Sequence, residues 1–225
     1  MDSSGAPLSE LPMPADNAAM PRASTASKWP PRIVVMALLF EGGLGLLGVL
    51  AGFVVKGIGQ DKKLPPAWDM LHGGPIDVVY GLAATIPMLA ALWGMRTARN
   101  GPLGRLNTIV DELVAPLFGK CTLAQLALIS VVAGFGEELL FRGAAQPLLI
   151  GWLGTTSGLI IASLIFGVMH AITKTYALLA TLVGIYLGWL TLETNGLVAP
   201  IVAHALYDFL ALVYLTRATT AKPQP

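Results

Sequence analysis

Apolar runs of about 20 residues recur along this chain of 225 residues, separated by short polar stretches. Each run is long enough to cross the roughly 30 Å hydrocarbon core of a bilayer as an α-helix. Backbone groups in lipid must be satisfied within each segment, and the alternating pattern of a barrel is absent, so the predicted fold class is all-α, a polytopic membrane helix bundle. About six transmembrane helices are expected, at residues 33 to 55, 76 to 95, 121 to 146, 149 to 171, 176 to 193 and 197 to 215.

The segments between and beyond these spans differ in character. Residues 1 to 31 are rich in Pro, Ser and Ala without a periodic apolar face, which indicates a disordered tail. Residues 105 to 118 carry an apolar stripe with Asp111 and Glu112 on the other side, which favours a helix lying at the membrane interface. The predicted organisation is a tail at 1 to 31, membrane helices and the interfacial helix at 32 to 120, a core at 121 to 215, and a C-terminal tail at 216 to 225.

The composition is that of a membrane protein and limits the kinds of partner that the protein is expected to bind. Hydrophobic residues make up 55% and charged residues 12%, about half the charged fraction of a soluble domain, and the mean hydropathy is +0.69. A net charge of +1 argues against nucleic acid as a ligand, because that requires a concentrated basic face. The lipid bilayer and membrane-associated peptides or proteins are the expected partners.

The distribution of lysine and arginine predicts an orientation. With the N-terminus in the cytoplasm, ten of these residues lie inside and three outside, Arg142 being left out because it falls within a span. The positive-inside rule therefore favours both termini in the cytoplasm. We expect an integral protein of a bacterial plasma membrane.

Ionisable residues are rare after residue 120, and six of them gather in three short stretches on three predicted helices. A charge at the bilayer centre costs at least about 2.5 to 3.5 kcal/mol on insertion scales, so such residues normally face a protein interior or a water-filled cavity. This cost indicates a functional site in the bundle core. The stretches are GEELLFRG at 136 to 143, FGVMH at 166 to 170 and HALYD at 204 to 208.

The spacing in the first stretch assigns different tasks to its charges. Glu138 and Arg142 are four residues apart with the acid first, the favourable order for a pair on one helical face. Glu137 is rotated by about 100° from Glu138, so it can point into a cavity while its neighbour holds Arg142. The alternative is that all three form a packing network between helices.

The other two stretches add imidazole groups to this carboxylate. Phe166 and His170 share a helical face, as do His204 and Asp208. A buried glutamate can take a proton from water, and a nearby histidine can orient that water. A cationic His204 or a protonated Asp208 could then stabilise an oxyanion.

A divalent metal such as zinc is the alternative chemistry for the same residues. Glu137, His170 and His204 could bind the ion, whose open position would activate water. Both chemistries predict amide hydrolysis within the membrane. The sequence contains no HExxH helix of the usual zinc proteases.

Together, EELLFRG, FGVMH and HALYD resemble the CPBP family of intramembrane proteases, also called the CAAX prenyl protease or Abi family. Its pattern is EExxxR, FxxxH and HxxxN or HxxxD on successive transmembrane helices, and the match covers roughly residues 120 to 212. The resemblance implies proteolysis near the membrane, with a site that opens to the cytoplasm.

The resemblance also implies a role for each residue of the motifs. Glu137 looks like the water-activating glutamate assisted by His170, and His204 with Asp208 like the oxyanion-stabilising pair. Glu138 and Arg142 match the supporting acid and arginine. Asp208 stands where many members have Asn, so it would have to be protonated or metal-bound to serve an oxyanion.

Glu41 lies near the middle of the first predicted helix, outside the three motifs. We predict that it borders the active-site cavity or pairs with a charged residue of the motifs. Four glycines on the same segment permit a close helix contact: Gly42, Gly43, Gly45 and Gly48.

Two other functions compete with the protease, and one geometric question stays open. A non-catalytic scaffold or immunity protein of the same fold would carry the same helices, and a proton-coupled transporter also uses buried acids and histidines. The transporter is disfavoured because no internal repeat is visible. An ideal count places Glu137 and His170 at different distances from the turn near residue 149. A tilt, a break near Gly143 or Pro147, or a different helix boundary could bring them level.

Overall fold

Helices make up the fold of the computed structural model, which describes residues 32–58 and 69–220. No strand occurs in these two ranges, which confirms the all-α class. The predicted disordered tail at 1 to 31 lies outside the described residues. The elements are α1 (Arg32–Ile58), a 3₁₀ turn (Asp69–Leu71), α2 (Pro75–Thr97), α3 (Gly101–Phe118), α4 (Leu123–Leu140), a π-helical turn (Phe141–Ala145), α5 (Gln146–Leu153), α6 (Thr155–Met169), α7 (Lys174–Thr194) and α8 (Val198–Thr220).

Five helices of the described chain are long and apolar enough to cross a membrane, so the protein is an integral membrane protein. They cover Arg32–Val54, Pro75–Thr97, Leu123–Leu153, Lys174–Thr194 and Val198–Arg217. The fourth predicted span, at 149 to 171, is wrong. Its first residues belong to the end of α5, and the rest is α6, whose 15 residues are too few for a full span.

The connection before α6 lies later than predicted. The helix does not end near residue 147 but runs to Leu153 and turns at Gly154, whose φ of 81° favours glycine. Pro147 does not end the helix because a π-helical turn directly precedes it, in which the Gln146 N–H bonds to the Phe141 carbonyl. That altered hydrogen-bond pattern accommodates a residue without an N–H.

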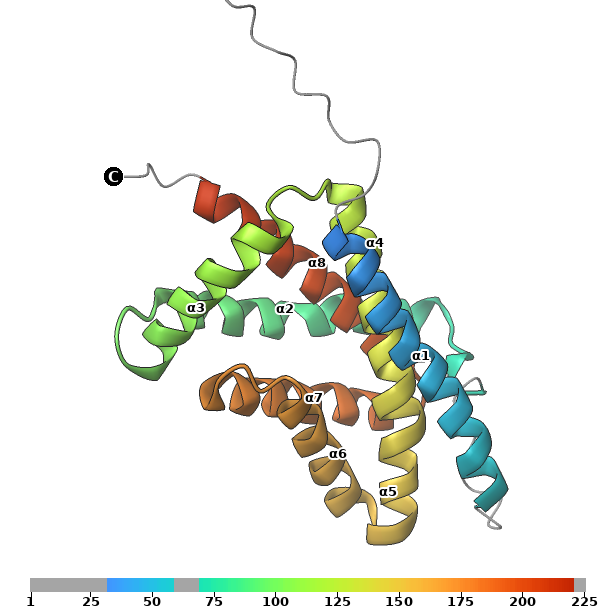
Figure 1. The fold of residues 1–225 in the computed structure, drawn as a ribbon. Coiled ribbons are helices and arrows are strands. Elements are labelled where there is room, and N and C mark those ends of the chain that lie inside the picture. The colour runs from blue at the N-terminus through green and yellow to red at the C-terminus, as the bar shows by residue number, and fades with distance from the viewer. Residues whose placement is uncertain (1–31, 59–68, 221–225) are drawn as a thin grey trace, which may run out of the picture.

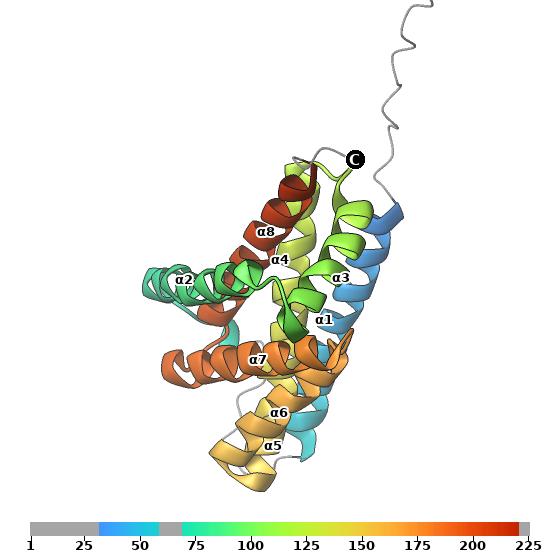
Figure 2. The ribbon, with the colours of Figure 1, turned by 90° about the vertical axis from the view of Figure 1, so that its left-hand side faces the viewer.

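Helix α1 runs alongside α4, and α8 crosses α4 on its other side (Figures 1 and 2). Two of the predicted glycines make the first contact possible. A Cβ on Gly48 would lie 2.6 Å from the Leu140 amide nitrogen, and one on Gly45 would lie 3.2 Å from the Gly136 Cα. Gly42 and Gly43 have open space instead. The contact brings α1 against the residue that precedes Glu137.

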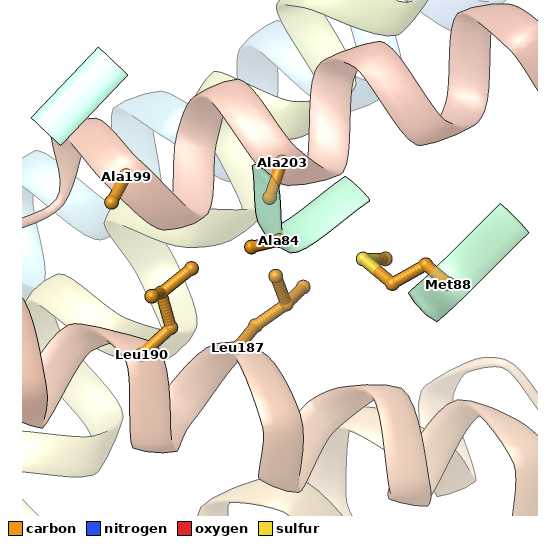
Figure 3. Packing of buried hydrophobic residues seen from close by; sticks show 6 residues of the cluster. All are labelled: Ala84, Met88, Leu187, Leu190, Ala199 and Ala203. Atoms are coloured by element: carbon orange, nitrogen blue, oxygen red, sulfur yellow. The ribbon is translucent and has the colours of Figure 1, made fainter. Parts of the chain in front are cut away.

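Small and branched apolar side chains fill the space between α2, α7 and α8 (Figure 3). The cluster consists of Ala84, Met88, Leu187, Leu190, Ala199 and Ala203. The Tyr186 hydroxyl donates to the Ala84 carbonyl at 3.2 Å, which links α7 to α2. On the outside, large apolar side chains such as Leu39 and Trp93 are exposed, as expected of a surface that faces lipid.

Helix α3 matches the amphipathic helix predicted at 105 to 118, and polar contacts attach it to the end of α2. Arg96 donates to Asp111 at 2.7 Å, and the Asn107 amide donates to the carbonyls of Met95 and Ala98, both at 2.9 Å. Its apolar face packs against α8. Its place at the membrane interface stays a prediction.

Candidate active site

The three charged stretches meet where α4, the end of α6 and α8 come together. A Cβ on Gly134 would lie 2.8 Å from the Ala205 amide nitrogen, so this glycine lets α8 approach α4 beside His204. Glu137 lies 17 residues before Gly154, and His170 lies 16 residues after it. The predicted helix boundary was therefore wrong, and the later turn at Gly154 brings these two residues level.

Glu138 is fully buried and accepts hydrogen bonds from two cationic or polar groups. Its Oε1 atom lies 2.8 Å from Arg142 Nη1 and 2.8 Å from His204 Nδ1. Arg142 also donates to the Gly184 carbonyl at 3.1 Å and stacks over the Phe166 ring at 4.5 Å. The predicted pair is thus a three-residue network that connects α4, α7 and α8.

This network fixes the orientation of His204. Because Glu138 Oε1 accepts from the Arg142 guanidinium, we assign the Nδ1 atom of His204 as a second donor to the same oxygen. The Nε2 atom then faces the other carboxyl groups, 3.9 Å from Glu137 Oε2 and 3.6 Å from Asp208 Oδ2. The Nδ1 atom of the imidazole is bonded to the protein, and the Nε2 atom is available to a bound molecule.

His170 is held in a similar way by the helix that precedes it. Its Nδ1 lies 2.8 Å from the Phe166 carbonyl oxygen, which can only accept, so Nδ1 carries the hydrogen. The Phe166 ring packs on the imidazole with 4.4 Å between centroids. The Nε2 atom of His170 is left facing Glu137 Oε2 at 3.5 Å.

Two cavities meet at this point. One, of about 310 Å³, has apolar walls from α2, α3, α7 and α8, with Glu137, His170, His204 and Asp208 in its lining. The other, of about 410 Å³, lies against α1 and contains Glu41 in its wall. The residues that line both are Glu137, His170, Ile172 and Tyr176. The structure therefore places Glu41 at the wall of the predicted site.

Within the described residues, no group of three or more His, Cys, Asp or Glu side chains is arranged to hold a metal ion. Glu137, His170 and His204 do come together, with the Nε2 atoms of the two imidazoles 3.5 and 3.9 Å from Glu137 Oε2. As they stand, the three side chains do not form a metal centre.

Sequence reasoning missed Gln146 and Tyr176. Gln146 is buried and donates to the Gly188 carbonyl at 3.1 Å, one helical turn from the contact of Arg142 with Gly184. A Cβ on Gly188 would lie 2.5 Å from the Gln146 side-chain oxygen, so a larger residue there would make the Gln146 side chain shift. The spacing of four from Arg142 was a usable signal for Gln146, whereas Tyr176 had none.

The fold and the site together define the class: an integral membrane helix bundle with a buried cluster of carboxyl and imidazole groups consistent with a catalytic site. A protein-family model described as "Type II CAAX prenyl endopeptidase Rce1-like" matches residues 119–210. These residues form a domain of that family, which confirms the resemblance drawn from the three motifs. A domain of this family implies a protease. The chain matches no curated protein and no solved structure.

Proposed function

We propose that this protein is an intramembrane endopeptidase that hydrolyses peptide bonds of membrane-associated substrates with a water molecule activated by Glu137 and His170. One observation carries the proposal. Glu137 Oε2 is buried without a hydrogen-bond partner among the described residues, and it faces the Nε2 atom of His170 at 3.5 Å. A carboxylate and a neutral imidazole nitrogen are both acceptors, so a water molecule that donates one hydrogen to each would satisfy the pair.

The reaction follows from this placement of water. Glu137 takes one proton from the water, and the hydroxide oxygen attacks the carbonyl carbon of the scissile bond. The oxygen of that carbonyl gains negative charge, which a cationic His204 can stabilise through its Nε2–H while Glu138 accepts from Nδ1. Glu137 then gives its proton to the amide nitrogen, and the C–N bond breaks to release an acid and an amine. Asp208, 3.6 Å from His204, supports the cationic imidazole.

The apolar cavity supports a substrate that is itself associated with the membrane. Its walls contain side chains such as Leu106, Ile109 and Leu113 from α3, and the polar groups gather at Glu137, His170, His204 and Asp208. An apolar segment of substrate in this cavity would bring an adjoining peptide bond to the polar groups. The supporting residues Glu138, Arg142 and Phe166 hold the two imidazoles in place.

The test is cleavage of a membrane-peptide library by the purified full-length protein, with and without a strong chelator. We expect cleavage that the chelator leaves unchanged and that His170→Ala lowers by about 10² to 10⁴-fold, because this substitution removes an acceptor that orients the water. Loss of cleavage on chelation, restored by zinc, would instead make Glu137, His170 and His204 metal ligands. If wild type cleaves nothing, the protein is a non-catalytic scaffold or immunity protein.

We further infer that both termini lie in the cytoplasm of a bacterium and that the site opens on that side. The excess of lysine and arginine supports this orientation, which requires α6 and its flanking residues to return the chain across the membrane. A cysteine placed at Lys174, with Cys121 replaced by serine, should react with an impermeant reagent only after the cells are opened. Strong labelling in intact cells would contradict the orientation.

A further inference from the structure

Glu41 lies on α1, outside the family domain, yet shares a cavity with the residues of the proposed reaction. It stands four and seven residues before Gly45 and Gly48, so the three share the helical face that packs on α4. A Cβ on Gly136 would meet the Glu41 backbone carbonyl. This close approach of two backbones fixes Glu41 beside the residue that precedes Glu137.

The carboxyl group of Glu41 has an oxygen that the described protein leaves without a partner. Glu41 is half-buried as a residue, but its Oε2 atom is buried and makes no hydrogen bond to any described residue. The other ionisable side chains in the wall of this cavity are Glu137, His170 and Tyr176, and no lysine or arginine lines it. A carboxylate away from water costs free energy unless a positive group or several donors meet it.

The charges around the site also leave Glu41 without a positively charged partner of its own among the described residues. Four carboxyl groups gather there, those of Glu41, Glu137, Glu138 and Asp208, and the basic groups among them are Arg142 and the imidazoles of His170 and His204. Arg142 and His204 are already bonded to Glu138. A positive charge delivered to the cavity of Glu41 would therefore meet an unmatched carboxyl group.

We propose that Glu41 is a specificity-determining residue that binds a basic side chain, Lys or Arg, of the substrate. The inference rests on the endopeptidase activity proposed above. The peptide would pass the junction of the two cavities, with its apolar segment against α3 and α8 and its basic residue against α1. A lysine ammonium or arginine guanidinium supplies both the charge and the donors that the Oε2 atom lacks. A backbone amide would satisfy the oxygen but leave its charge unmatched.

The experiment compares peptide series cleaved by the full-length protein. Each series places Ala, Lys or Glu at one position, and the positions cover both sides of the scissile bond. For wild type we expect kcat/KM for Lys to exceed that for Ala by about tenfold at one position on one side, the size expected of a charged hydrogen bond. Glu41→Gln should remove this preference, Glu41→Lys should transfer it to Glu, and Glu41→Asp should retain part of it.

Several results would overturn the inference, and they differ from failure of the proposed function. Glu193→Gln is the matched control, since Glu193 is exposed and lines neither cavity, and it should keep the wild-type preference. Wild type that cleaves well but does not prefer Lys at any position would contradict a role for Glu41 in specificity, whatever the variants do. A Glu41→Gln variant that cleaves all peptides more slowly by the same factor would also contradict this role. That result would indicate that Glu41 acts on the structure of the protein. If wild type cleaves nothing, the endopeptidase activity itself falls, and this inference with it.

Discussion

Replacement of Glu137 by glutamine should lower peptide-bond hydrolysis by about 10² to 10⁴-fold, the usual contribution of a general base. Glutamine has the shape of glutamate, but its amide cannot take a proton from water. It would also donate to His170 Nε2, 3.5 Å from the present carboxylate oxygen, and so displace the water from that nitrogen. The loss of the base and the loss of the water site should together lower kcat. The measurement is single-turnover cleavage of a membrane peptide by purified protein.

The stability of the Glu137→Gln variant should not fall. A loss of activity without a loss of stability would show that the substitution affects the reaction and not the fold. The Oε2 atom of Glu137 has no hydrogen-bond partner among the described residues, so the amide removes a buried charge and breaks no short contact. The unfolding midpoint of Glu137→Gln should equal or exceed that of wild type, and Glu193→Gln should change neither property. A Glu137→Gln protein that still cleaves within tenfold of wild type would show that another group activates the water.

The pattern of apolar residues was sufficient to predict most helices. Four predicted spans, at 33 to 55, 76 to 95, 176 to 193 and 197 to 215, agree with α1, α2, α7 and α8 to within a few residues, because a helix in lipid needs a long apolar run and ends where polar residues begin. Charges within those runs then indicated the residues of the candidate site, since each buried charge has a high cost.

The geometry around α5 and α6 could not be predicted in the same way. The residues on both sides of Gly154 are apolar, so hydropathy does not mark the turn. Pro147 suggested an earlier end because a proline usually interrupts a helix, and the π-helical turn that absorbs it has no sequence pattern of its own. Only the position of Gly154 explains why Glu137 and His170 are level.

Contacts to backbone carbonyls could not be predicted from the sequence either. The spacing of Glu138 and Arg142 predicted their ion pair, but the second bond of Arg142, to Gly184 on α7, depends on which helix becomes its neighbour. The same holds for His204, whose bond to Glu138 joins residues 66 apart in the chain. Local periodicity says which face a side chain occupies and leaves open what meets it.

The ion pair of Glu138 and Arg142 leads to the largest expected effect on stability. Their side chains are 0% and 2% exposed, so Arg142→Met would leave the Glu138 carboxylate buried with His204 as its remaining bonded partner. Breaking a buried pair by removal of one partner typically costs about 3 to 5 kcal/mol. The free energy of unfolding of the variant, measured in detergent micelles by chemical denaturation, should fall by about that amount.

A double variant distinguishes the ion pair from simple packing in that region. In Glu138→Gln with Arg142→Met, no charge is left unmatched, and the glutamine oxygen can still accept from His204 Nδ1, so the loss should be well below the sum of the two single losses. The contrast is Asp111→Asn, which breaks a pair whose side chains are 12% and 25% exposed and should cost about 1 kcal/mol or less. Additive losses in the double variant would show that Glu138 and Arg142 contribute separately. The orientation of His204 would then have to be attributed to its packing against Phe166, whose ring centroid lies 6.1 Å away.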